Sequence, residues 1–168
     1  MMARWVEGTG VEPMAGEDFR QRGTVRGSSA DGRIAVGWLV HPDAQPTQAA
    51  IWSGRARAEV LKDAEGAAVR PGARNWKMGV TATGSRLVGS LAGPEDRPVA
   101  FIWDRDRGAR PLAEVLQENG IETPGWTLTA ASSISSDGTV VVGTGTNPQG
   151  EEDAWRAVIG APPARPPP

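Results

Sequence analysis

Short apolar runs recur along the chain, and each is bounded by glycine or by small polar residues. Ile34-Ala35-Val36 and Val140-Val141-Val142 are nearly continuous runs, which suit strands covered on both faces. The 168-residue chain has 22 glycines and 14 prolines, spread along its length rather than gathered in one linker. This composition is typical of many short strands joined by turns, so the pattern predicts an all-β fold.

One nine-residue block occurs three times. In each copy two glycines stand five residues apart, and a valine precedes the second glycine. The copies are residues 29–37, 81–89 and 135–143, so they are offset by 52 and 54 residues. Self-similarity at such a period is the signature of a repeat architecture.

A block that pairs alanine with tryptophan follows each copy, at residues 49–52, 100–103 and 154–157. Nine residues separate a tryptophan from an aliphatic residue in Trp52–Leu61, Trp103–Leu112 and, at the N-terminus, Trp5–Met14. We therefore expect the chain to open in the middle of one unit and to run through three more.

The glycines of the repeated block predict turns and close contacts. Asp31-Gly32 and Asp137-Gly138 favour two-residue hairpins with a type I′ turn. Thr83-Gly84 takes this place in the middle copy, where we expect a different turn type. The second glycine of each block follows a strand run, so we expect close backbone approach there. These second glycines are Gly37, Gly89 and Gly143.

Four strands in about 50 residues, repeated, are typical of propeller blades. We predict a β-propeller-like array of four-stranded antiparallel blades in a single domain, residues 1–160. The approximate units are 2–14, 24–61, 76–112 and 126–159. Pro111, Gly120 and the apolar residues between them predict a short helix near 112–119. Residues 161–168 are rich in proline, and we expect a disordered tail there.

Closure is the physical problem of this array, because three and a half blades are fewer than a propeller ring contains. We expect one of three solutions: self-association, a longer chain, or a four-bladed ring. In the ring, the N-terminal strands around Trp5 and Met14 complete the sheet formed by Ile134 to Ile159, and we favour this solution.

The charge balance excludes two partner classes. The chain has 18 basic and 20 acidic side chains and a formal net charge of −2. Nucleic acids and anionic lipids attract concentrated cationic faces, so we expect neither nucleic-acid binding nor membrane docking. The sequence also has no apolar stretch of the roughly 20 residues that a membrane helix needs, and it has no cysteine.

The unit Ser-x-Asp-Gly-x-x-x-Val-Gly, followed by Ala-x-x-Trp, resembles the bacterial HAF-type extracellular repeats of autotransporter-like and surface-sorted proteins. The last unit matches best, through residues 125–128, 134–138, 143–150 and 154–155, with the short helix before it. The Ser-x-Asp-Gly core also resembles TolB-type propeller blades. The resemblance covers about residues 2 to 159, and it implies a propeller with an extracellular or cell-surface location.

Two features depart from that family. Residues 1–8 lack the apolar run of a signal peptide, and the first unit lacks its opening strands. Together they suggest a fragment, or a start assigned to an internal methionine. The positions shared with the family are structural, so the resemblance implies no catalytic residue.

Tryptophan is the most prominent candidate for binding, with seven residues against no tyrosine and two phenylalanines. Trp5, Trp52 and Trp103 share one repeat position, so we expect them to pack between blades. Trp38, Trp76, Trp126 and Trp155 also favour packing, with stacking on sugar rings as the alternative.

The other motifs favour structural roles. Asp104-x-Asp106-x-Gly108 lacks the rest of a calcium loop and contains two arginines, so we interpret it as a solvated charged turn. Ser135–Thr139 resembles the Asp-box of sialidases with the wrong spacing. The only histidine, His41, has no identifiable nucleophile or acid beside it, and we place it in a surface loop. Glu151-Glu152-Asp153 is typical of a strand edge protected from pairing. Gly143–Thr146 lacks the ending of a phosphate loop.

Our leading hypothesis is a non-catalytic module with a binding or structural role and no cofactor. We assign no catalytic, metal or cofactor-binding residue, and we expect carbohydrate or another protein as partner. The alternative is a propeller-type glycan hydrolase or lyase, and a third reading is a fragment without independent function. The enzyme needs three or more carboxyl groups with raised pKa values around a central opening.

Overall fold

A computed structural model describes residues 3–13, 22–41, 44–54, 58–70 and 77–160. The expected tail at 161–168 lies outside these residues, as do Met14 and Trp76. The described chain is mainly β, with three antiparallel sheets, a separate hairpin and one short α-helix. The predicted all-β class is therefore confirmed.

Each sheet is a meander whose strands neighbour one another in chain order. The first sheet contains β3 (Arg22–Ser28), β4 (Ile34–His41), β5 (Ala44–Ser53) and β6 (Glu59–Val60). The second contains β7 (Gly79–Val80), β8 (Arg86–Ala92), β9 (Pro98–Asp104) and β10 (Gly108–Pro111). The third contains β11 (Thr127–Ile134), β12 (Val140–Thr146) and β13 (Glu152–Val158). The hairpin is formed by β1 (Ala3–Val6) and β2 (Gly10–Pro13).

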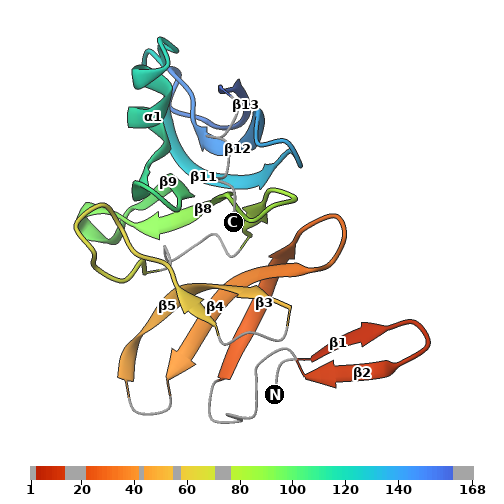
Figure 1. The fold of residues 1–168 in the computed structure, drawn as a ribbon. Coiled ribbons are helices and arrows are strands. Elements are labelled where there is room, and N and C mark those ends of the chain that lie inside the picture. Colours follow the sequence, from red (N-terminus) through yellow and green to blue (C-terminus); the bar gives the residue numbers. More distant parts are fainter. Residues whose placement is uncertain (1–2, 14–21, 42–43, 55–57, 71–76, 161–168) are drawn as a thin grey trace.

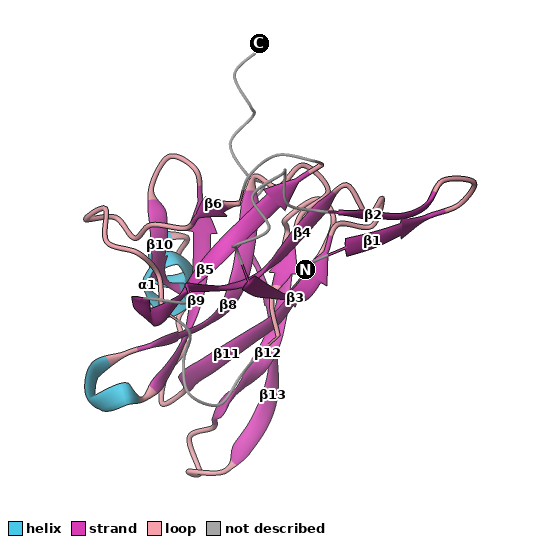
Figure 2. Ribbon diagram, turned by 90° about the horizontal axis from the view of Figure 1, so that it is seen from below, coloured by secondary structure: helices cyan, strands magenta, loops and turns pink. Residues whose placement is uncertain are grey.

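The three sheets are stacked in sequence order, with the second between the first and the third (Figure 1). Side chains along the strands of the second sheet pack alternately into two apolar clusters. Leu87, Phe101 and Trp103 pack with the first sheet, whereas Val88 and Ile102 pack with the third. Strands covered on both faces carry continuous apolar runs for this reason, and Figure 2 shows the stack from below.

The same turn joins the first two strands at all three copies of the repeated block. The N–H of Gly32, Gly84 or Gly138 donates to the carbonyl oxygen three residues earlier, at 2.9–3.1 Å. These glycines have φ of +68°, +68° and +76°, whereas the residue before each has a negative φ. The geometry is a type I turn followed by a left-handed glycine, so the predicted type I′ turns are wrong.

A hydroxyl group selects this turn. The Ser29 hydroxyl accepts the N–H of Ile34 at 3.0 Å and donates to the carboxylate of Asp31 at 2.6 Å. Ser135 and Asp137 repeat the arrangement. In the middle copy Thr81 accepts the N–H of Arg86 at 3.1 Å. The different turn expected there is therefore also wrong.

The type I′ turn occurs between β8 and β9, within a short 3-10 segment, η1 (Pro94–Asp96). Glu95 and Asp96 have φ of +55° and +56°, and they are the positive-φ residues other than glycine in the described chain. The N–H of Arg97 donates to the carbonyl oxygen of Pro94 at 3.1 Å. Asparagine and glycine normally occupy these two central positions, so the sequence did not indicate this turn.

The expected close backbone approach is confirmed at Gly37 and Gly143, whereas at Gly89 the close neighbour is a side chain. A Cβ at Gly37 would overlap the carbonyl oxygen of Thr24, and one at Gly143 would overlap that of Ala130. At Gly89 it would lie 2.7 Å from the ring of Phe101. The strands facing Gly37 and Gly143 are bulged beside these contacts.

The predicted helix is confirmed as α1 (Leu112–Glu118). Pro111 precedes it, and Gly120 follows with φ of +72°. Leu112, Val115 and Leu116 are buried in the cluster that joins the second and third sheets. The helix therefore covers the junction between two neighbouring sheets.

Neighbouring sheets also touch through their first strands. A Cβ at Gly27 in β3 would overlap the carbonyl oxygen of Met78, which precedes β7. A Cβ at Gly79 in β7 would lie 2.8 Å from both the Cα of Ser133 and the N of Ile134 in β11. Gly27 and Gly79 are 52 residues apart, so one repeat position makes both contacts.

The four-bladed closure is wrong, because within the described residues β1 and β2 pair only with each other and β13 pairs only with β12. Trp5 and Val11 face each other in the hairpin, as Trp103 and Ala109 do between β9 and β10. The hairpin thus has the register of third and fourth strands. Because β13 already fills the third place in the last sheet, the hairpin cannot complete that sheet as predicted.

Candidate functional site

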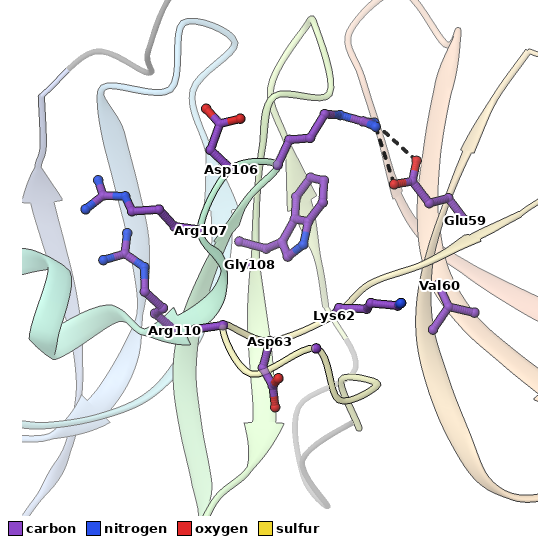
Figure 3. A pocket seen from close by; sticks show the side chains of 12 residues that line it. Glu59, Val60, Lys62, Asp63, Asp106, Arg107, Gly108 and Arg110 are labelled. Carbon is purple, nitrogen blue, oxygen red and sulfur yellow. Dashed lines mark hydrogen bonds and ion pairs between the residues drawn. The ribbon is translucent and has the colours of Figure 1, made fainter.

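A cleft of about 830 Å³ lies between the first and second sheets (Figure 3). Its walls come from β6 and the segment after it on one side, and from the β9–β10 turn on the other. The lining residues are Glu59, Val60, Lys62, Asp63, Ala64, Gly66, Trp103, Arg105, Asp106, Arg107, Gly108 and Arg110.

Backbone pairing fixes the two walls. The N–H of Ala109 in β10 donates to the carbonyl oxygen of Lys62 at 2.9 Å, and Asp63 forms a parallel bridge with Ala109. The Asp63 carboxylate accepts the N–H groups of Glu65 and Ala67 at 3.0 and 2.8 Å. The segment that leaves the first sheet is thus held against the outer strand of the second.

Arg105 links the two walls. Its guanidinium donates to both carboxylate oxygens of Glu59, at 3.2 and 3.4 Å, and Figure 3 shows this pair crossing the cleft. The same group lies 5.9 Å from the ring centroid of the buried Trp103. Since both charged side chains are about half exposed or more, the pair stabilises the fold by at most about 1 kcal/mol.

A second ion-pair network lies behind the β9–β10 turn. Asp104 is buried, and its carboxylate lies 3.4 Å from Arg110 and 3.9 Å from Arg107. Glu118 of α1 accepts hydrogen bonds from both arginines, at 2.9 and 3.2 Å. The hydrogen bond from Arg110 is the largest cause that lowers the pKa of Glu118. The network joins α1 to the turn.

This arrangement favours recognition of charge over proton transfer. The carboxylates of Glu59, Asp104 and Glu118 all face arginines, and the pKa of Glu118 is lowered, chiefly by its hydrogen bond from Arg110. A general acid at neutral pH needs a raised pKa. Lys62 and Asp106 add exposed charges at the cleft, so an ionic partner can contact its rim.

The structure places the motif residues in structural roles. Asp104 is buried and paired with arginines, so the predicted solvated turn is wrong at this residue, and its carboxylate is not open to calcium. Asp137 accepts the hydroxyl of Ser135 and the N–H of Thr139 inside the repeated turn. His41 ends β4 rather than lying in a loop, and its side chain is outside the described part.

The described tryptophans differ in burial. Trp52 and Trp103 are buried as predicted, and so is Trp38. Trp5 is 72% exposed, so its expected packing between blades is wrong. No preceding sheet covers it within the described residues. Trp126 and Trp155 are half-buried beside the cluster under α1.

Two polar segments lie on the third sheet. Glu151-Glu152-Asp153 leads into β13, an edge strand of this sheet among the described residues, and its protection of the edge stays a prediction. Gly143–Thr146 lies within β12 rather than in a phosphate loop.

Sequence reasoning missed Glu59, Glu118 and Arg86. Glu59 is 46 residues from Arg105, so no local pattern reveals that pair. Arg86 is buried between sheets and donates to the carbonyl oxygens of Gly138 and Gly160. Its repeat equivalent, Ile34, lies next to Gly84 across the other junction, so the repeat alignment could have marked position 86 as an inter-sheet contact.

Two further findings concern the described residues alone. They contain no cluster of three histidine, aspartate or glutamate side chains that could hold a metal ion. No helix among them is long and apolar enough to cross a membrane.

No protein-family model matches the chain, and no curated protein has significant similarity to it. The family resemblance of the repeat, and the location that it implies, stay predictions.

Proposed function

We propose that the chain is a non-catalytic repeat module of β-propeller type, with a binding role carried by the charged cleft. The sheets then correspond to consecutive blades of an open array. An extracellular or cell-surface location, implied by the resemblance to HAF-type repeats, belongs to the same proposal.

One observation carries the architecture: successive sheets use equivalent positions to contact each other. Ile34 reaches Gly84 of the next turn, and Arg86 reaches Gly138. Ile34 and Arg86 stand 52 residues apart, and Gly84 and Gly138 stand 54 apart, which are the offsets of the repeat. Repeat proteins bury their cores through such neighbour contacts, and propeller blades are four-stranded meanders of this kind.

The titratable groups support a non-catalytic role. An enzyme of propeller type would need several carboxyl groups with raised pKa values at one opening. Among the described carboxyl groups with a resolved shift, the pKa values of Asp31, Asp137 and Glu118 all lie below the ordinary range, chiefly because of side-chain hydrogen bonds. No observation in the described chain favours a hydrolase or lyase.

The cleft supports an acidic partner, either a carboxylate-bearing carbohydrate or an acidic protein segment. Arg105 and Arg107 are both more than half exposed, and Lys62 is exposed on the facing wall. Carboxylates are recognised by guanidinium groups with good geometry. Glu59 competes for Arg105, so we expect weak, salt-dependent binding.

Titration with polygalacturonate and with neutral dextran tests this role, with a parallel assay for new reducing ends and unsaturated sugars. We expect binding of the acidic polymer without product. Arg105→Glu abolishes this binding, whereas Arg33→Glu, at a side chain 84% exposed outside the cleft, leaves it unchanged. Product formation would contradict the non-catalytic role. Equal binding of the polymer by both variants would show that the cleft is not the binding site.

A further inference from the structure

The third sheet has three strands in the described part of the chain, whereas the first and second sheets each have four. In the second sheet, residues 101–104 of β9 pair with β10. Their repeat equivalents in β13, 54 residues later, are Trp155, Arg156, Ala157 and Val158. These same four residues line a groove of about 700 Å³, and among the described strands β13 pairs only with β12. The groove therefore lies where β10 lies in the second sheet.

The other walls of the groove are mostly apolar. Trp126 and Trp155 are half-buried there, and of the twelve lining residues only Glu122, Thr123 and Arg156 are polar or charged. A strand that entered the groove would pair its backbone with β13 and bury alternate side chains.

The chain contains a strand of matching design. Strand β2 reads Gly10-Val11-Glu12-Pro13, and β10 reads Gly108-Ala109-Arg110-Pro111. Both begin with a glycine of positive φ, +82° and +70°, and both end with proline. Val11 faces Trp5 as Ala109 faces Trp103. By sequence and register, β2 is a fourth strand.

At two of the four positions, β13 offers β2 the same type of pairing partner as β1 does. In the hairpin, Arg4 lies opposite Glu12 and Val6 lies opposite Gly10. At the corresponding places β13 carries Arg156 and Val158. Moving β2 from β1 to β13 therefore keeps an arginine opposite Glu12, and opposite charges facing across strands are favourable.

The exchange is energetically accessible. Trp5 and Val11 are 72% and 68% exposed in the hairpin, and an isolated two-stranded hairpin is marginally stable in water. Ala109, the equivalent of Val11, is only 6% exposed in its four-stranded sheet. Beside β13, Val11 would gain comparable burial against Trp126 and the end of α1.

The hairpin and the third sheet lie at opposite ends of the molecule (Figure 1), which points to a second copy as the source of the strand. We propose that β2 of one copy takes the fourth-strand place beside β13 of another, with Val11 opposite Ala157 and Glu12 opposite Arg156. Such a head-to-tail contact forms rings or filaments. It does not depend on the ligand of the charged cleft.

Disulfide trapping tests the register, because the chain has no cysteine of its own. Opposed residues in an antiparallel pair have Cα atoms about 4.5–5.5 Å apart, within the reach of a disulfide. Full-length Glu12→Cys and Arg156→Cys proteins of different isotopic mass are mixed and oxidised. We expect a cross-linked species that contains one copy of each. Arg97→Cys, at a side chain 79% exposed on the β8–β9 turn, serves as the matched control with Glu12→Cys.

Cross-linking no greater than in the Arg97→Cys control would overturn the proposal. So would a Glu12→Cys/Arg156→Cys double variant that closes only within one chain at high protein concentration. Charge exchange gives a second readout by light scattering. Glu12→Arg or Arg156→Glu weakens self-association about two- to fivefold, as for a cross-strand charge pair, and the double exchange restores it. A mass of 17.6 kDa for the unmodified chain at every concentration would also overturn the proposal.

Discussion

The contact between the first strands of neighbouring sheets makes Gly79→Ala the most informative single substitution. Its Cβ would lie 2.8 Å from the Cα of Ser133 and from the N of Ile134, whereas carbon atoms in contact are normally about 3.5–4.0 Å apart. Both obstacles are backbone atoms, so no side-chain rotation relieves the overlap. Strands β7 and β11 must therefore separate by roughly 0.7 Å or more.

Overpacking of this kind costs about 1–3 kcal/mol. The substitution also removes conformational freedom from the unfolded chain, which returns about 0.4–1 kcal/mol. We expect a net loss of about 1–2 kcal/mol in the free energy of unfolding. For a domain of this size this corresponds to a fall in Tm of about 2–8 °C.

Urea unfolding followed by tryptophan fluorescence measures this loss, because Trp38, Trp52 and Trp103 are buried. Gly160→Ala is the matched control. The nearest atom to its added Cβ, Oδ1 of Asn119, lies at 3.5 Å, so it carries the same change in the unfolded chain without the overlap. Equal stability of the two variants would refute the close packing of β7 on β11.

Three further outcomes are expected. Replacing Glu95 and Asp96 by Asn and Gly stabilises the chain by about 1 kcal/mol in thermal unfolding, because Asn and Gly suit a type I′ turn better. Unchanged stability would show that the positive φ of Glu95 and Asp96 does not strain the turn. Thr83→Asp supplies the carboxylate that the other two turns possess, and a net hydrogen bond raises the free energy of unfolding by about 0.5–1.5 kcal/mol; lower stability would show that the turns are not equivalent. Hydrogen bonds from serine lower the pKa values of Asp31 and Asp137 below 3.8. The stability that these two carboxylates contribute is therefore present above that pH and is lost as the pH falls through the lowered pKa values. The free energy of unfolding of the Asp31→Asn/Asp137→Asn double variant, measured in urea at neutral and strongly acidic pH, should depend less on pH than that of the parent. An unchanged pH dependence would show that these two carboxyl groups do not contribute to acid unfolding.

The outer face of the third sheet is more exposed than the corresponding faces of the first two sheets. Arg156 stands where Ile51 and Ile102 stand in the first two sheets, and it is exposed. Val142 is 39% exposed, whereas its equivalents Val36 and Val88 are fully buried. Exposed repeat faces are polar for solubility, and Arg156 gives the outer face of the third sheet this character.

The repeat and its period could be predicted from the sequence because equivalent positions share backbone geometry. Gly37 and Gly143 each lie against a backbone carbonyl of the neighbouring strand for this reason. The turn type was wrong because an aspartate–glycine pair suits two turns, and the hydroxyl of Ser29 two residues earlier selects between them. Trp5 was misplaced because its repeat position is buried only where a neighbouring sheet covers it.

The candidate cleft could not be found from the sequence. The charged turn at Arg105 and Arg107 was visible, but its partners Glu59 and Glu118 come from a different strand and from the helix. Such pairs follow from the stacking of the sheets, which periodicity does not fix. The same limit applies to closure, since the pattern of β13 does not show whether a fourth strand lies beside it.

Consecutive sheets stack through one repeat position in their first strands. Nuclear Overhauser effects in the full-length chain test this stacking. We expect cross-peaks from the Hα protons of Gly27 to Met78, and from those of Gly79 to Ser133 and Ile134. Cross-peaks within each sheet but at neither of these two junctions would contradict the repeat stack.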